Sequence, residues 1–213
     1  MSSHAFPIVA CGDDALRVLC GAGAIRHELA RRLATDRLWI EVVPGREDIT
    51  VSFDLHTMRM VAAEARLAES INDQRKCAPR KVRTHILEAV FGGESGPDLS
   101  SLAERIGRPE SAIVSEVLSA SLTVDMLGFT PGFAYLSGLS SDIVSERLAH
   151  PRARVAAGSI GLITGQIGLY ALDGPGGWPI VGRILNPLFD RERTEPFVLL
   201  AGDNVQLRQA AAA

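Results

Sequence analysis

The sequence is poor in cysteine and has none of the common metal-binding spacings. Its three cysteines, Cys11, Cys20 and Cys77, are odd in number, far apart and outside any CxxC pattern. The five histidines form neither an HxH nor an HExxH motif. A disulfide framework needs paired cysteines, and a zinc centre needs ligands at short, regular spacings. The sequence therefore predicts neither a disulfide scaffold nor a metal site.

Long apolar runs and an excess of positive charge are also missing. No stretch reaches the roughly 18 apolar residues of a membrane span, and the first residues show no basic region followed by an apolar one. The net charge is −3, and lysine occurs only at Lys76 and Lys81. Nucleic acids and anionic membranes attract basic surfaces. We therefore expect a cytoplasmic protein with no nucleic-acid partner and no membrane partner.

Nucleotide-binding and hydrolase motifs are absent as well. Neither the phosphate-cradling GxxxxGK[ST] pattern nor the GxSxG turn of serine hydrolases occurs. Gly21-Ala22-Gly23 begins like a dinucleotide-binding fingerprint, but Arg26 stands where the third glycine belongs. Any reaction driven by ATP would therefore need a nucleotide site on a partner chain.

The remaining patterns are typical of a folded α+β protein. Hydrophobic residues make up 46% of the chain and charged residues 22%, as in soluble globular proteins. In residues 1–80, apolar periods of strands and helices alternate and predict the order β-α-β-β-α at 15–20, 25–33, 39–43, 49–53 and 56–71. This order suits a small split βαβ, ferredoxin-like domain, closed by a further strand if residues 82–90 supply it, with a polar linker at 72–80.

Residues 81–213 form the second predicted domain. Residues 99–119 have the apolar spacing of two short helices. The second helix carries Glu110 and Glu116, which would repel a DNA backbone, so we interpret the pair as packing helices. Further on, short apolar runs broken by glycine and proline predict a closed or nearly closed β-barrel, with strands at 122–127, 159–163, 166–172, 178–184 and 198–207. A tight turn at 173–177 is expected to join the third and fourth of these as a hairpin.

Two glycine-rich stretches carry side chains that ordinary amphipathic patterns do not explain. Residues 91–99 contain Glu94, a carboxylate without a capping role, and Asp98, which we expect to cap the following helix. In residues 128–139, glycine and proline hold an apolar segment rigid, and it could lie in the core, in a cleft or at a protein interface. Its key residues are Phe129, Pro131, Phe133 and Tyr135.

Two later stretches offer polar groups that could hold a small molecule. Arg152 follows a rigid proline and could bind a carboxylate or phosphate through two hydrogen bonds. In residues 165–183, the amide of Gln166, the hydroxyl of Tyr170 and the charge of Arg183 are expected to converge on a small molecule that carries an amide. Trp178 belongs either to this site or to the core.

Taken in order, these stretches resemble the family that contains the B-type subunit of 5-oxoprolinase. The shared patterns are GGExGPDL, GFTPGFxYL, HPRxxVxAGS, GQxGxYxLxxPGGWxxxGR and LFD. Proteins of this family also carry the names allophanate hydrolase subunit 1 and sporulation-kinase inhibitor. The resemblance implies an N-terminal α+β domain followed by a cyclophilin-like β-barrel.

The resemblance also implies an activity. The chain would be one component, inactive alone, of an enzyme that uses ATP to open 5-oxoproline to glutamate. Its implied partners are a C-type subunit with its own cyclophilin-like barrel and a TIM-barrel-like A-type subunit, and ATP is bound with or by these partners. Glu94, Arg152 and Gln166 are the implied catalytic residues. The implied substrate-binding or partner-binding residues are Phe129, Pro131, Phe133, Tyr135, His150, Ser159, Tyr170, Gly176, Gly177, Trp178 and Arg183.

Several positions depart from the family pattern and leave the substrate open. Ala156, Ile167 and Ala171 stand where the family commonly has proline, threonine and proline, and Leu118-Ser119 replaces a His-Ser pair. One alternative is a carboxyltransferase part of a urea carboxylase or allophanate system. Another is a binding protein that inhibits a histidine kinase by docking through its aromatic segment.

Overall fold

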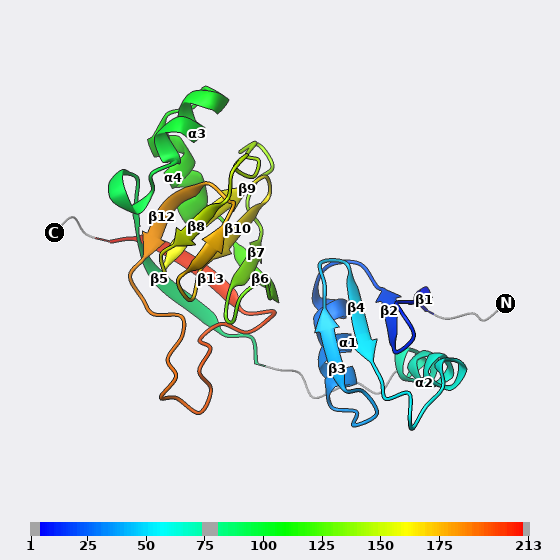
Figure 1. The fold of residues 1–213 in the computed structure, drawn as a ribbon. Coiled ribbons are helices and arrows are strands. Elements are labelled where there is room, and N and C mark those ends of the chain that lie inside the picture. Colours follow the sequence, from blue (N-terminus) through cyan, green and yellow to red (C-terminus); the bar gives the residue numbers. More distant parts are fainter. Residues whose placement is uncertain (1–4, 74–80, 211–213) are drawn as a thin grey trace. The chain divides into compact units, whose positions relative to one another are not determined.

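The computed structural model describes residues 5–73 and 81–210. The chain divides into two compact units, Met1–Lys81 and Val82–Ala213, which Figure 1 colours from blue to cyan and from green to red. Each combines strands with two α-helices, so the predicted α+β class is confirmed. No helix in the described ranges is long and apolar enough to cross a membrane.

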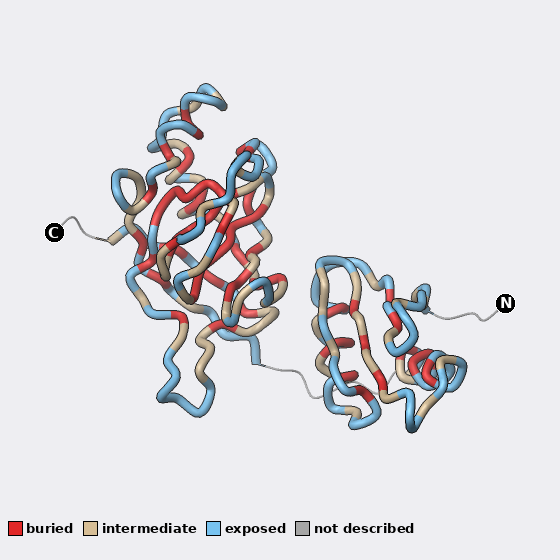
Figure 2. Tube along the Cα trace, in the orientation of Figure 1, coloured by how far each residue is buried: buried red, intermediate tan, exposed pale blue. Residues whose placement is uncertain are grey.

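The first unit is a four-stranded antiparallel sheet with two helices. Its strands lie in the order β1-β2-β4-β3, and their apolar side chains alternate, so that one face of the sheet is buried. This face and the apolar side of the helices share one core, visible as the red segments in Figure 2. The elements are β1 (Ile8–Ala10), β2 (Ala15–Leu19), α1 (Ala24–Ala34), β3 (Glu41–Pro44), β4 (Asp48–Ser52) and α2 (Met60–Asn72).

The split βαβ order is present, but its outer strand differs from the prediction. Residues 82–90 do not close this sheet, because the position beside β2 is taken by β1. With only three residues, β1 is too short for its apolar period to be recognised. Of the predicted linker, Asn72 ends helix α2, and residues 74–80 lie outside the described ranges.

The second unit is built on a closed barrel with the strand order β10-β7-β6-β13-β5-β12-β9. Helix α4 packs against β13, and a short 3-10 helix, η1 (Gly93–Ser95), follows β5. A separate two-stranded sheet pairs β8 with β11. The bounds are β5 (Thr84–Phe91), α3 (Leu99–Ile106), α4 (Glu110–Ser119), β6 (Leu122–Leu127), β7 (Ala134–Ser137), β8 (Arg152–Val155), β9 (Ser159–Ile163), β10 (Gln166–Leu169), β11 (Gly174–Gly176), β12 (Ile180–Ile184) and β13 (Asn204–Gln209).

Alternation along the barrel strands decides which side chains face outward. Ile160, Leu162, Ile167 and Leu169 are fully buried members of the barrel core, and Figure 2 shows the buried segments gathered inside the barrel. Because successive side chains of a strand point to opposite faces, the residues between them lie on the outer face. Gln166, which precedes Ile167, therefore lies on the outer face of β10.

Two predictions within the barrel are wrong. The segments 166–172 and 178–184 do not form a hairpin, because β9 lies between β10 and β12 and pairs with both. The turn expected at 173–177 contains strand β11 instead. Strand β13 begins only at Asn204, so the predicted strand at 198–207 starts six residues too early. Pairing between distant strands is not visible in a local apolar pattern.

Candidate functional site

Two glycines leave space for aromatic rings on the outer face of the barrel. Gly168 of β10 lies opposite Gly161 of β9 and opposite Tyr135 of β7. A Cβ atom on Gly168 would lie 2.6 Å from Cζ of Phe133 and 3.0 Å from two ring carbons of Trp178. At Gly161 it would lie 3.0 Å from Cβ of Trp178. The glycines are therefore required by close packing of rings on the strands.

The rings that cover these two glycines belong to one aromatic cluster, which consists of Phe133, Tyr135, Tyr170 and Trp178. The ring centre of Phe133 lies 4.7 Å from that of Tyr135 and 4.8 Å from that of Tyr170, both edge to face. Trp178 lies 5.8 Å from Tyr135 and 6.1 Å from Phe133. Such edge-to-face pairs stabilise an arrangement by about 0.5–1.5 kcal/mol each beyond burial. The cluster is therefore a second, rigid apolar core outside the barrel.

Phe129 differs from the other rings of its segment. The residue is 60% exposed, and its ring centre lies 5.5 Å from that of Phe133, edge to face. Its φ of 70° lies in the left-handed region, where no other non-glycine residue of the described chain is found. Strained backbone of this kind is often kept for function. The segment 128–139 thus combines a buried anchor, Phe133, with an exposed ring.

The two phenols of the aromatic cluster share an electrostatic environment. Burial raises the pKa of Tyr135, and the positive charge of Arg147 partly offsets this. Burial likewise raises the pKa of Tyr170; the neighbouring Tyr135 adds to the rise, while Arg147 and Arg152 oppose it. Sequence reasoning missed Arg147, which stands in a polar segment without any motif. Both phenols remain protonated and able to donate hydrogen bonds at neutral pH.

We expect both tyrosines to ionise only above the pH at which they ionise in the unfolded chain, about 10. A pKa raised by folding means that the folded state keeps its proton longer, so stability is intact below about pH 10 and falls as the pH rises toward the folded pKa. Tyr135 and Tyr170 are the only two tyrosines of the chain, so the absorbance of phenolate reports on this aromatic cluster alone. Arg147→Gln should move both titrations to higher pH. Titrations that coincide in folded and urea-unfolded protein would contradict this.

Gln166 lies at the edge of the same outer face. It is 5% exposed, yet its side-chain amide forms no hydrogen bond to any described residue, and the amide atoms are not among those fully enclosed by protein. Its cross-strand neighbours Ser137 and Ile163 are half-buried. An amide with little access to water and no protein partner gains most from a new hydrogen bond. Gln166 is therefore suited to pair with a ligand that brings its own donor and acceptor.

Asp98 occupies the N-cap position of helix α3, as expected, but its side chain binds elsewhere. Its side chain makes no capping hydrogen bond. Instead, it accepts two hydrogen bonds from Arg152, at 2.7 and 2.8 Å, and a third from the backbone N–H of Ile180 at 2.6 Å. The hydrogen bonds to Asp98 also raise the pKa of the Arg152 guanidinium. Asp98 therefore joins the starts of α3, β8 and β12. The guanidinium of Arg152 is bound to a carboxylate of the protein itself.

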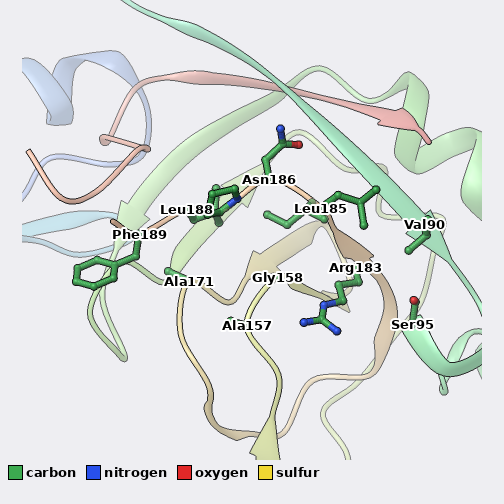
Figure 3. Close-up of a pocket in the computed structure, with 12 residues that line it drawn as sticks. Val90, Ser95, Ala157, Gly158, Ala171, Arg183, Leu185, Asn186, Leu188 and Phe189 are labelled. Carbon is green, nitrogen blue, oxygen red and sulfur yellow. The ribbon is translucent and has the colours of Figure 1, made fainter. Parts of the chain in front are cut away.

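Arg183 lines a different hollow, a pocket of about 500 Å³. In Figure 3 its guanidinium extends into the space between Ala157, Gly158 and Ser95. Neither Gln166 nor Tyr170 lines this pocket, and β9 separates the strand of Gln166 from that of Arg183, so the structure does not bring these three side chains together in it. The lining residues are Val90, Ser95, Ala157, Gly158, Ala171, Arg183, Ile184, Leu185, Asn186, Pro187, Leu188 and Phe189.

The other predicted site residues take varied positions. Glu94 is exposed in η1, beside the pocket residue Ser95. Pro131 and His150 are exposed, and Ser159 is buried in β9. Gly176 packs against the hydroxyl of Tyr170, and a Cβ on Gly177 would lie 3.5 Å from Pro151. No group of three or more metal-ligating side chains occurs in the described part of the chain.

This combination of a small split βαβ unit and a closed barrel matches a known class of domain. Residues 7–199 match the carboxyltransferase domain, subdomain C and D, and the chain belongs to that family. More narrowly, its curated relatives are named as the B subunit of 5-oxoprolinase, as the ordered motifs predict. The Escherichia coli O157:H7 protein is 36% identical, covering 84% of this chain and 81% of its own. The Bacillus subtilis protein is 32% identical, covering 94% and 91%.

Solved structures share the fold. A conserved uncharacterized protein from Pyrococcus horikoshii, PH0987, is 30% identical with a TM-score of 0.58, covering 96% of this chain and 97% of its own. TTHA0988 is 25% identical with a TM-score of 0.78, and this chain spans only 40% of its length. The Kluyveromyces lactis urea carboxylase is 16% identical with a TM-score of 0.75, covering 95% of this chain and 21% of its own, and this likeness shows the fold alone.

Proposed function

We propose that this chain is the B-type subunit of an ATP-dependent 5-oxoprolinase, inactive without its partners. The observation that carries this proposal is the 32–36% identity to proteins named as the B subunit of 5-oxoprolinase, over more than four-fifths of both chains. The partners are a homologous C-type subunit with a cyclophilin-like barrel and a TIM-barrel-like A-type subunit, and the setting is cytoplasmic.

The proposed reaction explains why ATP is needed. A five-membered lactam is a stable amide, so water opens it slowly. Transfer of the terminal phosphoryl group of ATP to the carbonyl oxygen, with release of ADP, makes the carbonyl carbon electrophilic. Water then adds to that carbon, the C–N bond breaks as nitrogen takes up a proton, and hydrolysis releases phosphate and glutamate. This chain has no phosphate-binding loop of its own, so the partner subunits hold the nucleotide.

Gln166 has the chemistry to recognise the lactam. A five-membered ring holds the amide cis, so its N–H and C=O lie on one edge. The primary amide of Gln166 offers a C=O and an N–H in the complementary order. The adjacent aromatic cluster provides rigid apolar walls for the ring. Glu94, exposed in a glycine-rich loop, is the proposed acid or base in the shared site, and Arg152 positions that loop through Asp98.

Reconstitution tests this function. Co-expressed with A-type and C-type subunits, the chain should support release of glutamate from 5-oxoproline only when ATP is present. The double variant Glu94→Ala, Gln166→Ala should lose at least about 100-fold in turnover, since it removes a proton-transfer group and a substrate contact. Glu104→Ala, Gln206→Ala is the matched control, because both residues are exposed on other elements, α3 and β13.

Three outcomes would count against this proposal. Full turnover by the Glu94, Gln166 double variant would remove those residues from the site. Activity on urea that depends on biotin would favour the carboxyltransferase alternative. Inhibition of histidine-kinase autophosphorylation by the isolated chain would favour the binding-protein alternative, for which the exposed ring of Phe129 offers an anchor.

A further inference from the structure

The pocket that contains Arg183 is apolar apart from a few polar groups. Val90, Ile184, Leu185, Leu188 and Phe189 contribute aliphatic and aromatic wall to its volume of about 500 Å³. Figure 3 shows Arg183 entering this space from β12, opposite the hydroxyl of Ser95. Ligand pockets typically have this size and this mixture of apolar walls with a few placed polar groups.

The guanidinium of Arg183 has no acidic partner within the described chain. The positive charge of Arg183 contributes to lowering the pKa of Asp173, but Asp173 is bound to other donors. It accepts hydrogen bonds from Arg154 at 2.6 and 3.1 Å and from the backbone N–H of Ala157 at 2.7 Å. These hydrogen bonds, from Ala157 first and then from Arg154, lower the pKa of Asp173, so it stays ionised and bound to them. Arg183 is thus left free to bind an anion from outside.

The backbone at Gly158 leaves room for the exposed side chain of Arg183. Gly158 has a φ of 84°, and a Cβ there would lie 3.3 Å from Cγ and 3.4 Å from Nε of Arg183. The absence of a side chain lets the arginine stem lie against the Gly158 backbone. Gly158 is itself fixed, because its N–H donates to the carbonyl oxygen of Tyr170 at 2.7 Å and its carbonyl oxygen accepts from Ile184 at 2.8 Å.

We propose that this pocket is a second binding site of the chain, separate from the face of Gln166, and that it binds the carboxylate of a small cyclic amide acid through Arg183, with the ring against the apolar wall. The inference rests on the proposed function, which supplies 5-oxoproline as a molecule of this class. A carboxylate matches the two-pronged geometry of one guanidinium. A phosphate group would call for several converging donors, and the lining offers one cation and no second arginine or lysine.

Calorimetry on the full chain and on the assembled complex tests the proposal. The two ligands are 5-oxoproline and 2-pyrrolidinone, which is the same lactam without its carboxylate. Arg183→Gln should weaken 5-oxoproline binding by about 10-fold or more, as expected for a lost charge-assisted contact, and leave 2-pyrrolidinone binding unchanged. Arg183→Lys should recover part of the loss. Ala157→Leu, which narrows the pocket without changing charge, should weaken both ligands.

Arg105→Gln is the matched control, because Arg105 is exposed on α3 and does not line the pocket. Two results would overturn the inference: Arg183→Gln with wild-type affinity for 5-oxoproline, or loss of binding in Arg147→Gln instead, which would place the carboxylate at the aromatic cluster. Inorganic phosphate that displaces 5-oxoproline at equal concentration would also overturn it.

Failure of this inference and failure of the proposed function give different results. If the assembled complex turns over 5-oxoproline and Arg183→Gln leaves 5-oxoproline binding unchanged, the function stands and the pocket assignment is wrong. If the wild-type complex shows no turnover but binding of 5-oxoproline depends on Arg183, the pocket assignment stands and the function is wrong.

Discussion

Replacing Asp98 by alanine is expected to lower the free energy of unfolding of the barrel unit by about 3 kcal/mol. The change removes three hydrogen bonds at once and leaves two donors without a partner, the Arg152 guanidinium and the Ile180 N–H. The Asp98 side chain is 13% exposed and that of Arg152 34%, so water compensates for this loss only in part. Urea denaturation followed by the near-ultraviolet circular dichroism of the two tyrosines measures the effect in this unit.

The chain contains a matched control for this prediction. Asp173 accepts the same set of donors, two nitrogens of Arg154 and one backbone N–H. Its pair is much more exposed, 45% for Asp173 and 80% for Arg154, and exposed ion pairs contribute little to stability. Asp173→Ala should therefore shift the denaturation midpoint far less than Asp98→Ala. Equal shifts would show that burial does not set the strength of these contacts.

Gly168→Ala is expected to destabilise the barrel unit by about 2 kcal/mol, because it inserts a methyl group where the strand is already covered by rings. The new Cβ would lie 2.6 Å from Phe133 and 3.0 Å from Trp178, and both rings are fixed by edge-to-face contacts with their neighbours. The rings must move outward, which also disturbs the face beside Gln166. We expect a lower thermal midpoint, a changed aromatic circular dichroism and weaker turnover in the assembled enzyme.

Gly128→Ala is the control for this second prediction. A Cβ on Gly128 meets no atom within 4 Å, and its φ is not in the left-handed region. The same added methyl group should leave stability within about 0.5 kcal/mol of wild type. A Gly168→Ala protein as stable as Gly128→Ala would mean that the aromatic cluster does not pack tightly on the strands.

Local sequence patterns were sufficient for the class of fold. Apolar alternation at Ile160 and Leu162, and again at Ile167 and Leu169, predicts strands with one buried face, and all four residues are in the barrel core. The helical spacing in 99–119 predicts two short helices, which are α3 and α4. These features depend on neighbours within a few residues, so a local pattern contains the information. The order of the motifs was equally sufficient for the family.

Only the tertiary structure decided how the polar residues are used. Arg152 and Arg183 are equivalent in the sequence, each an arginine in a glycine-containing motif, but one is bound to Asp98 and the other enters a pocket. Likewise, a local pattern cannot show that β9 separates β10 from β12, which moves Arg183 away from Gln166. The physical reason is that an ion pair or a strand pairing joins residues tens of positions apart, and its strength depends on a burial that exists only after the barrel closes.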